Sequence, residues 1–238
     1  MIKNKSAQGH VEIIFSFVIF ILFLSLLLFF FNPFKTENRT ETYLDLVQNQ
    51  IEKRITKEID LLTLSINQSS SVSGCKYFPY NYSKNNSIIT KDLSENIFSS
   101  NYDYINEKIY INFLDTNKFY LIYFSDDFNA TSGCNDGIPL ESGNYTLGLL
   151  RTYDVVSFKQ LNENLSIEYN NNYNDLKKKI GIPQTKDFAL NFYKIDQTPI
   201  LNLGKSPEKT IVYARTIPIQ LAYENGTFIY GFMQIKIW

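Results

Sequence analysis

The chain has very little histidine and cysteine. Among its 238 residues, His10 is the only histidine, and Cys75 and Cys134 are the only cysteines. Ser-His-Asp and Cys-His catalytic sites require a histidine beside the nucleophile, and a zinc site normally draws about four ligands from these residue types. The chain also lacks a glycine-rich phosphate-binding motif. We therefore expect no enzymatic activity and no cofactor.

The chain also lacks an excess of charge of either sign. Its 23 Lys and Arg residues are balanced by 24 Asp and Glu residues, which leaves a net charge of −1. Nucleic-acid-binding domains usually carry clustered positive charge. The lysine run 177–179 is better explained as the end of a helix, where cations interact favourably with the helix dipole. We expect no nucleic-acid partner.

The segment 126–137 is rich in Asp, Asn and Gly, and its oxygens could hold Ca²⁺. It lacks the acid spacing and the closing glutamate of an EF-hand. Such clusters usually form turns. We interpret the segment as turns and predict no metal ligand, with a Ca²⁺ site as the alternative.

One long apolar run is present near the start. The 19 residues Ile13–Phe31 contain only two polar side chains, Ser16 and Ser25. As a helix this run would be about 28 Å long, close to the ~30 Å hydrocarbon core of a bilayer. Lys3 and Lys5 precede it, so the positive-inside rule places the N-terminus in the cytoplasm. The sequence thus predicts a single-pass membrane protein, with Ile13–Phe31 in the membrane and the C-terminal part outside the cell.

The residues leading into this run carry a possible processing signal. Lys5-Ser6-Ala7-Gln8-Gly9-His10-Val11-Glu12, followed by an apolar helix, resembles the class III signal of archaeal type IV pilin-like proteins. The resemblance implies that a prepilin peptidase cuts between Ala7 and Gln8, which would make Glu12 the fifth residue of the mature chain. It also implies assembly through the N-terminal helix. His10 departs from the pattern, because many archaeal members have a small residue there.

Glu12 is the one acidic residue at the edge of the apolar run. After cleavage, Gln8 would carry an α-amino group with an ordinary pKa of about 8. Because an unpaired charge in an apolar setting costs several kcal/mol, Glu12 of a neighbouring subunit could pair with it and fix one axial register. The alternative is a carboxylate that is merely favoured by the helix dipole near the helix start.

Two features agree with an extracytoplasmic location. Cys75 and Cys134 both follow the apolar run and would pair in an oxidising compartment, although two unrelated thiols are the alternative. Asn-x-Ser/Thr sequons are also more frequent than composition alone predicts. The N-glycosylation candidates are Asn38, Asn67, Asn81, Asn85, Asn129, Asn144, Asn164 and Asn225.

Changes in composition divide the chain into four parts. These are a basic leader at 1–7 that is cleaved, a transmembrane helix at 8–34, an amphipathic stalk helix at 35–64 and a β-rich extracytoplasmic head at 65–238. The stalk prediction rests on apolar residues spaced three or four apart, which share one helix face. They are Leu44, Val47, Ile51, Ile55, Ile59 and Leu62. The fold class predicted is α+β and pilin-like, with one N-terminal transmembrane and stalk helix followed by the head.

The head shows two hairpin patterns and a short helix. Lys108–Leu114 and Lys118–Phe124 predict one hairpin, and Thr210–Tyr223 with Thr227–Trp238 predict another around the Asn-Gly turn. Pro218 predicts that its strand lies at an edge or carries a bulge. A helix is predicted over 173–180, with Gly181 just past its end.

The function predicted is a pilin-like surface subunit of a type IV pilus-like filament or pseudopilus. Its partners would be a prepilin peptidase and other pilin-like subunits, identical or different. The size of the head favours a minor or accessory role. The alternative is a non-assembling, single-span, membrane-anchored extracellular binding domain.

Overall fold

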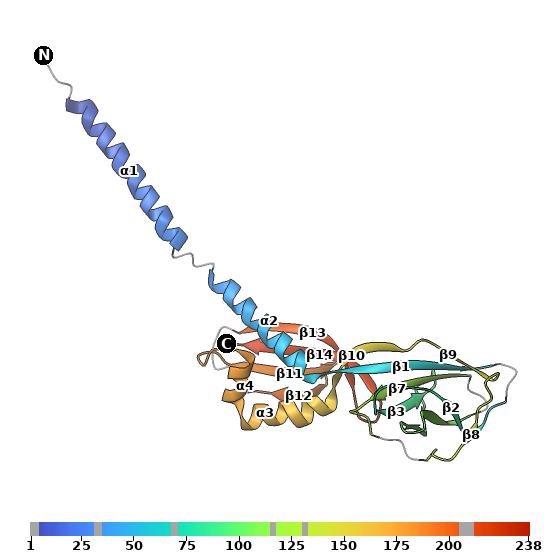
Figure 1. The fold of residues 1–238 in the computed structure, drawn as a ribbon. Coiled ribbons are helices and arrows are strands. Elements are labelled where there is room, and N and C mark those ends of the chain that lie inside the picture. The colour runs from blue at the N-terminus through green and yellow to red at the C-terminus, as the bar shows by residue number, and fades with distance from the viewer. Residues whose placement is uncertain (1–4, 31–34, 68–70, 115–117, 130–132, 205–211) are drawn as a thin grey trace.

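The structure of the protein is a computed structural model. It describes residues 5–30, 35–67, 71–114, 118–129, 133–204 and 212–238, and within the first two helices it describes side chains at 13–28 and from 41 onward. One helix projects from an elongated body that consists mostly of strands (Figure 1).

The helices are α1 (Lys5–Phe30), α2 (Lys35–Ile55), the π-helix η1 (Gln160–Leu165), α3 (Ser166–Asn171) and α4 (Tyr173–Ile180). The strands are β1 (Thr56–Ile66), β2 (Gly74–Pro79), β3 (Ser87–Lys91), β4 (Ile97–Phe98), β5 (Ser100–Asp103), β6 (Lys108–Phe113), β7 (Phe119–Ser125), β8 (Ile138–Pro139), β9 (Tyr145–Leu147), β10 (Arg151–Ser157), β11 (Phe188–Lys194), β12 (Pro199–Leu203), β13 (Tyr213–Ala222) and β14 (Phe228–Ile237).

The described strands form two sheets. The larger has the order β12-β11-β14-β13-β10-β1-β7-β3-β4, with β9 also paired to β1, and the smaller has the order β5-β6-β2-β8. One half of the large sheet carries α2, η1, α3 and α4 on a single face. The other half packs on the small sheet through a second core. The body therefore has a helix-on-sheet half and a sheet-on-sheet half.

The structure corrects the membrane prediction. Within the described residues, no helix is both long enough and apolar enough to cross a membrane. The predictions of a transmembrane helix at 8–34, of membrane contact through Ile13–Phe31 and of a single-pass cell-surface protein are therefore wrong. The predicted fold class is wrong with them, since the chain is dominated by a ten-stranded sheet.

The second helix is shorter than predicted. It ends at Ile55, and the chain continues directly into β1 at Thr56. Ile59 and Leu62 thus lie on a strand, so the prediction of a stalk helix through residue 64 is wrong at its C-terminal end. In β1, Leu62, Leu64 and Ile66 are buried while the residues between them are less so, which is the period of two expected of a strand.

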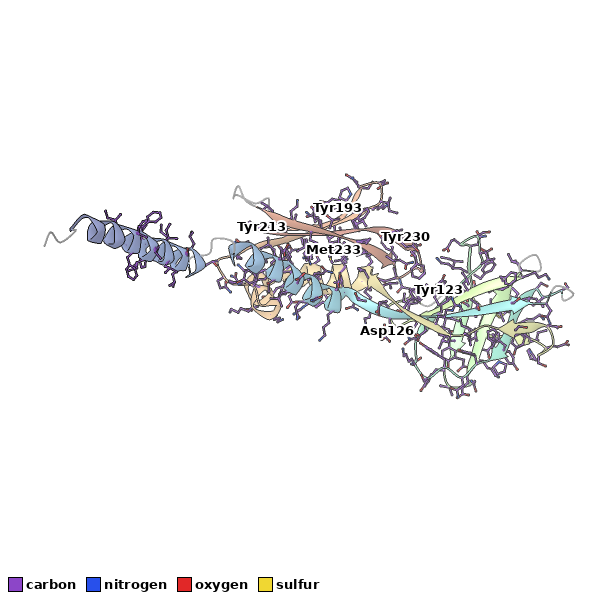
Figure 2. The ribbon with its side chains drawn as sticks, turned by 90° about the horizontal axis from the view of Figure 1, so that it is seen from above. Tyr123, Asp126, Tyr193, Tyr213, Tyr230 and Met233 are labelled. Carbon is purple, nitrogen blue, oxygen red and sulfur yellow. A yellow bond between two sulfur atoms is a disulfide. The ribbon has the colours of Figure 1, made fainter. Side chains whose placement is uncertain are left out.

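The prediction that the apolar residues before Ile59 share one helix face is confirmed for α2. Leu44, Val47, Ile51 and Ile55 are buried against the sheet. Their partners include Met233 of β14, whose position beside α2 can be seen in Figure 2. Burying an aliphatic side chain of this kind contributes about 1.5–3 kcal/mol. This contact anchors α2 to the body.

The C-terminal hairpin is confirmed over the described residues, which exclude Thr210 and Ile211. β13 and β14 pair antiparallel, and Gly226 in their turn has a φ of +80°. Among the described residues, β13 pairs with β10 only at Leu221 and Ala222. Pro218 therefore lies where no described strand pairs with the second side of β13, which agrees with the predicted edge position.

The first hairpin prediction is wrong. β6 pairs with β2 and β5 in the small sheet, whereas β7 pairs with β1 and β3 in the large one. The two strands instead stack face to face, and the rings of Phe113 and Tyr120 are 5.0 Å apart. The predicted turn at 115–117 lies outside the described residues. The alternating apolar residues that identified both strands thus build a contact between layers rather than a hairpin.

The short helix is confirmed. It runs from Tyr173 to Ile180, and Gly181 ends it with a φ of +85° while its N–H bonds the carbonyls of Lys177 and Lys178. This left-handed cap is the one that glycine favours. The sequence analysis missed η1 and α3, which precede α4 and complete the helical layer.

Candidate functional site

The most unusual surface of the protein is α1. Its described side chains are apolar except Ser16 and Ser25, and large hydrophobic residues are exposed around the whole helix. Ile13 is 69% exposed and Phe23 is 59% exposed. A helix that is apolar on all sides is normally buried. α1 therefore presents a large apolar surface without a partner in the described parts of this chain.

The predicted processing and assembly residues belong to the same helix. Ala7, Gln8 and Glu12 all lie within the helical backbone of α1. Their side chains lie outside the described residues. Cleavage between Ala7 and Gln8 and the pairing of Glu12 thus stay predictions.

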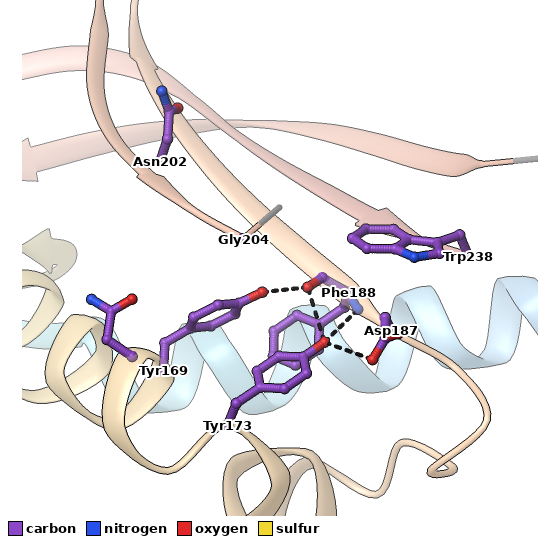
Figure 3. Close-up of a pocket in the computed structure, with 8 residues that line it drawn as sticks. Tyr169, Tyr173, Asp187, Phe188, Asn202, Gly204 and Trp238 are labelled. Carbon is purple, nitrogen blue, oxygen red and sulfur yellow. Dashed lines mark hydrogen bonds between the residues drawn. The ribbon is translucent and has the colours of Figure 1, made fainter. Parts of the chain in front are cut away.

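A cavity of about 540 Å³ lies at the end of the helical half of the body (Figure 3). It is open to solvent on one side and is lined by the α3–α4 junction and by the ends of β11, β12 and β14. Its lining residues are Tyr169, Asn170, Tyr173, Asp187, Phe188, Asn202, Gly204 and Trp238. Four of the eight are aromatic, and the sequence analysis did not identify the cavity, because its walls come from separate segments.

The polar groups of this cavity are largely satisfied by one another. The Tyr173 hydroxyl donates to Oδ1 of Asp187 (3.2 Å) and accepts the Phe188 N–H (2.9 Å). Lys177 Nζ, almost fully buried, donates to the same carboxylate oxygen at 2.9 Å. Burial raises the pKa of Tyr173 to about 12, so its phenol is neutral at physiological pH. The cavity is therefore polar but internally charge-compensated, which suits binding better than proton transfer.

The lysine run 177–179 is not a free basic patch. Lys177 bonds Asp187, Lys178 lies 3.4 Å from Asp175, and Lys179 pairs with Glu168. All three ammonium groups thus have carboxylate partners within the protein, in keeping with their expected structural role.

The two aspartates that begin the Asp- and Asn-rich segment make contacts within the protein. Asp126 pairs with Lys57 at 3.0 Å. The hydrogen bond that the Asp126 carboxylate accepts from Lys57 raises the pKa of this lysine. Asp127 accepts hydrogen bonds from the Ser157 hydroxyl (2.5 Å) and from the Gln160 amide (3.1 Å). The described residues contain no cluster of three or more His, Cys, Asp or Glu side chains suited to a metal ion.

The two cysteines form a disulfide. Cys75 in β2 and Cys134 are bonded, with a sequence separation of 59 and Cα atoms 5.6 Å apart. The predicted pairing is therefore present. It ties the small sheet to the segment that leads into β8.

The glycosylation candidates lie on the surface wherever their side chains are described, which excludes Asn38. Asn144 is partly exposed, and the others are exposed, namely Asn67, Asn81, Asn85, Asn129, Asn164 and Asn225. Five of these side chains already make hydrogen bonds within the protein. Asn67 donates to the Gly143 carbonyl, Asn129 to Glu224, Asn144 to Glu141 and Asn164 to Gln160, and Asn225 accepts from the Thr227 N–H. Their exposure is compatible with N-glycosylation at each of these asparagines and does not distinguish one from another.

The candidate sites are thus an exposed apolar helix with a processing motif and a neutral aromatic cavity. They lie at separate places on the molecule, as Figures 1 and 3 show. Comparison of the chain with protein-family models, with curated proteins and with the solved structures finds no match.

Proposed function

We propose that the chain is a pilin-like subunit that a prepilin peptidase processes between Ala7 and Gln8 and that assembles through α1. The observation that carries the proposal is the exposed apolar surface of α1 on every described side. The resemblance of residues 5–12 to a class III signal supports it independently.

The occupant proposed for this surface is α1 of other subunits, identical or pilin-like. A helix that packs inside a bundle of its own copies needs apolar residues all round, because each side meets a neighbour. The body would remain outside such a bundle, since α1 projects away from it (Figure 1). Glu12 and the new amino group of Gln8 would set the register between neighbours.

Mass spectrometry of the N-terminal peptide from the native host tests the processing step. A chain that begins at Gln8 is the expected result. A chain that retains Lys3 and Lys5 would contradict it.

Assembly is tested by electron microscopy and sedimentation of two variants. Phe17→Ser combined with Leu24→Ser places hydroxyls on α1, at positions 64% and 39% exposed, and should abolish filaments. The matched control is Leu149→Ser, because Leu149 is 81% exposed on the body and lies outside the proposed contact. Unchanged filament yield from the α1 variant would refute assembly through this helix.

Glu12→Ala tests the register. It should lower filament yield while the body folds normally, and Glu41→Ala, at an exposed position of α2, should leave the yield unchanged. A normal yield from Glu12→Ala would rule out the ion pair but leave apolar assembly through α1 in place.

The second candidate is a non-assembling binding domain. The aromatic cavity between α3, α4 and the strand ends favours it. Normal processing without filaments under any condition, together with a ligand that fills this cavity, would make it the better account.

A further inference from the structure

A second concave surface lies where the two halves of the body meet. It is a groove of about 490 Å³ between the turn end of the β13–β14 hairpin and the outer face of β3, β7 and β10. Figure 2 shows two of its residues, Tyr123 and Tyr230, at this junction. Its lining residues are Lys91, Glu95, Ile97, Tyr123, Tyr153, Gln220, Thr227, Phe228 and Tyr230.

The hairpin is held firmly over the sheet. Its turn approaches β3 so closely that a Cβ on Gly226 would lie 2.6 Å from the Ile89 side chain. Behind the groove, Ile89, Tyr123, Val155 and Ala222 form a buried cluster. The walls of the groove are therefore set by packing between strands that are distant in sequence.

Aromatic side chains line the groove, from the buried Tyr123 and the partly buried Phe228 to the exposed Tyr230. The ring centres of Tyr123 and Phe228 are 4.9 Å apart and tilted by 44°. Tyr230 lies opposite Gln220 on the neighbouring strand and is 61% exposed. A tyrosine that is so exposed at the wall of a groove offers a ring edge or face to a ligand.

Lys91 is the one cationic side chain among the described residues that line the groove, and it already has partners. Lys91, whose side chain is 3% exposed, lies 2.5 Å from the Glu95 carboxylate, and its Nζ is 4.9 Å from the Phe228 ring centre. The ammonium group thus has both a carboxylate and an aromatic partner. The groove is close to neutral, and it offers no vacant charge to an ionic ligand.

Several uncharged polar groups remain available. Within the described residues, the side chains of Tyr123, Tyr153, Gln220 and Thr227 have no hydrogen-bond partner, and none is among the buried unsatisfied atoms. Burial raises the pKa of Tyr123 to about 12 and also raises the pKa of Tyr153. Both hydroxyls therefore stay protonated at neutral pH and can donate as well as accept.

We infer that this groove binds a neutral oligosaccharide, with one sugar ring against Tyr230 and its hydroxyls bonded by Tyr153, Gln220 and Thr227. A sugar ring has an apolar C–H face and a rim of hydroxyls, which matches the exposed ring of Tyr230 beside uncharged polar groups. An apolar ligand would leave those groups unpaired, which is costly. A free cation would compete with Lys91 for the aromatic faces, and an anion would meet Glu95. The volume lies in the usual range for small-ligand sites.

Two sources could supply this sugar. One is a separate saccharide, and the other is a glycan on Asn225 of this chain, an exposed sequon two residues before Thr227. A glycan on Asn225 would begin at the rim of the groove. Both sources share the same recognition chemistry.

The test uses the full chain, produced once without glycosylation and once in the native host. The probes are neutral trisaccharides of glucose, mannose and galactose, and binding is followed by saturation-transfer NMR. The expected result is that the unglycosylated chain binds at least one of them and that Tyr230→Ala weakens binding by about tenfold. Tyr153→Phe, which removes only a hydroxyl, should weaken it several-fold.

The matched control is Tyr104→Ala, because Tyr104 is 47% exposed and lies outside the groove. Unchanged thermal unfolding shows that each variant is folded. Absence of saccharide binding by both chains, an equal affinity for Tyr230→Ala, or Tyr230-dependent binding of tripeptides without saccharides would each overturn the inference.

Trisaccharide binding by the chain from the native host distinguishes the two sources. If Asn225 carries the ligand, the native chain should bind no added trisaccharide until Asn225→Gln restores binding. Equal binding by the native and unglycosylated chains assigns the groove to a separate saccharide. Neither result depends on filament assembly, so the groove and the proposed function can fail independently.

Discussion

The hydroxyl of Tyr82 donates a hydrogen bond to Oδ2 of Asp60, a carboxylate that is only 4% exposed in the middle of β1. Thr152 of the neighbouring strand β10 donates to its other oxygen, and Lys84 Nζ lies 3.2 Å from Oδ2. Burial by itself would raise the pKa of Asp60, but the hydrogen bonds from Thr152, Tyr82 and Lys84 hold it below its usual value. Asp60 thus joins β1, β10 and the 80–86 segment through its charged form.

This arrangement predicts a pH-dependent stability. Because the pKa of Asp60 is lowered in the folded state, its contribution is present above the unfolded pKa of about 3.9 and is lost as the pH falls through the folded value. Asp60→Asn should reduce the free energy of unfolding by about 1–3 kcal/mol at pH 7. The deficit relative to the native chain should shrink below about pH 4.

Urea denaturation at pH 7 and at pH 2.5 measures both effects. Asp154→Asn is the control, because Asp154 is exposed on β10, and it should change stability little at either pH. An equal deficit for Asp60→Asn at both pH values would contradict the proposed role of the charge.

The disulfide between Cys75 and Cys134 should contribute strongly to stability. On the chain-entropy model, a bridge that closes a loop of 59 residues stabilises by about 4 kcal/mol. Replacement of both cysteines by serine should lower the unfolding free energy by about this amount. Dithiothreitol should produce the same loss in the native chain and none in the double variant. A native chain that is indifferent to reductant would show that the strands hold this region without the bridge.

Gly226 should be sensitive to substitution. It needs a φ of +80°, and a Cβ would meet Cγ2 of Ile89, a side chain that is fully buried and cannot move aside easily. Gly226→Ala should therefore destabilise the protein by about 1–3 kcal/mol. Gly143→Ala is the matched control, because a Cβ there meets nothing within 4 Å. Thermal unfolding of the two variants gives the comparison, and equal midpoints would argue against close packing of the hairpin on β3.

The parts of the fold that could be predicted are those whose signals are local. The helix at 173–180 is specified by Asp175, three lysines and Gly181 within nine residues. The β13–β14 hairpin is specified by its Asn225-Gly226 turn between two apolar runs. In both cases the residues that determine the element lie beside it in the chain.

The parts that could not be predicted depend on distant partners. β6 and β7 were located by their alternation, but the same alternation serves hairpins and stacked layers, so their pairing in different sheets was missed. Ile59 and Leu62 continue the helical spacing of α2 by coincidence, and strand pairing of β1 with β7 and β10 determines their actual structure. The aromatic cavity and the groove combine short segments from five or more elements and have no signal in any one of them.

The buried ammonium group of Lys177 should be needed for the α4 region. Its side chain is 2% exposed, and Nζ donates to the Gln184 carbonyl at 3.1 Å and to Asp187 at 2.9 Å. Lys177→Met keeps roughly the length of the side chain but leaves the Gln184 carbonyl without its hydrogen-bond donor. Because Asp187 is 48% exposed and can be rehydrated, the expected loss of stability is only about 1–2 kcal/mol.

Lys178→Met provides the control within the same helix, since Lys178 is 68% exposed and lies 3.4 Å from an equally exposed partner, Asp175. Exposed pairs of this kind contribute little, so Lys178→Met should unfold at nearly the same denaturant concentration as the native chain. Added salt should reduce the small destabilisation of Lys178→Met further, because salt screens an exposed ion pair much more than a buried one. The destabilisation of Lys177→Met should change little. Equal midpoints for the two variants would mean that the burial of Lys177 reflects packing of its methylene chain, with no net stabilisation from its hydrogen bonds.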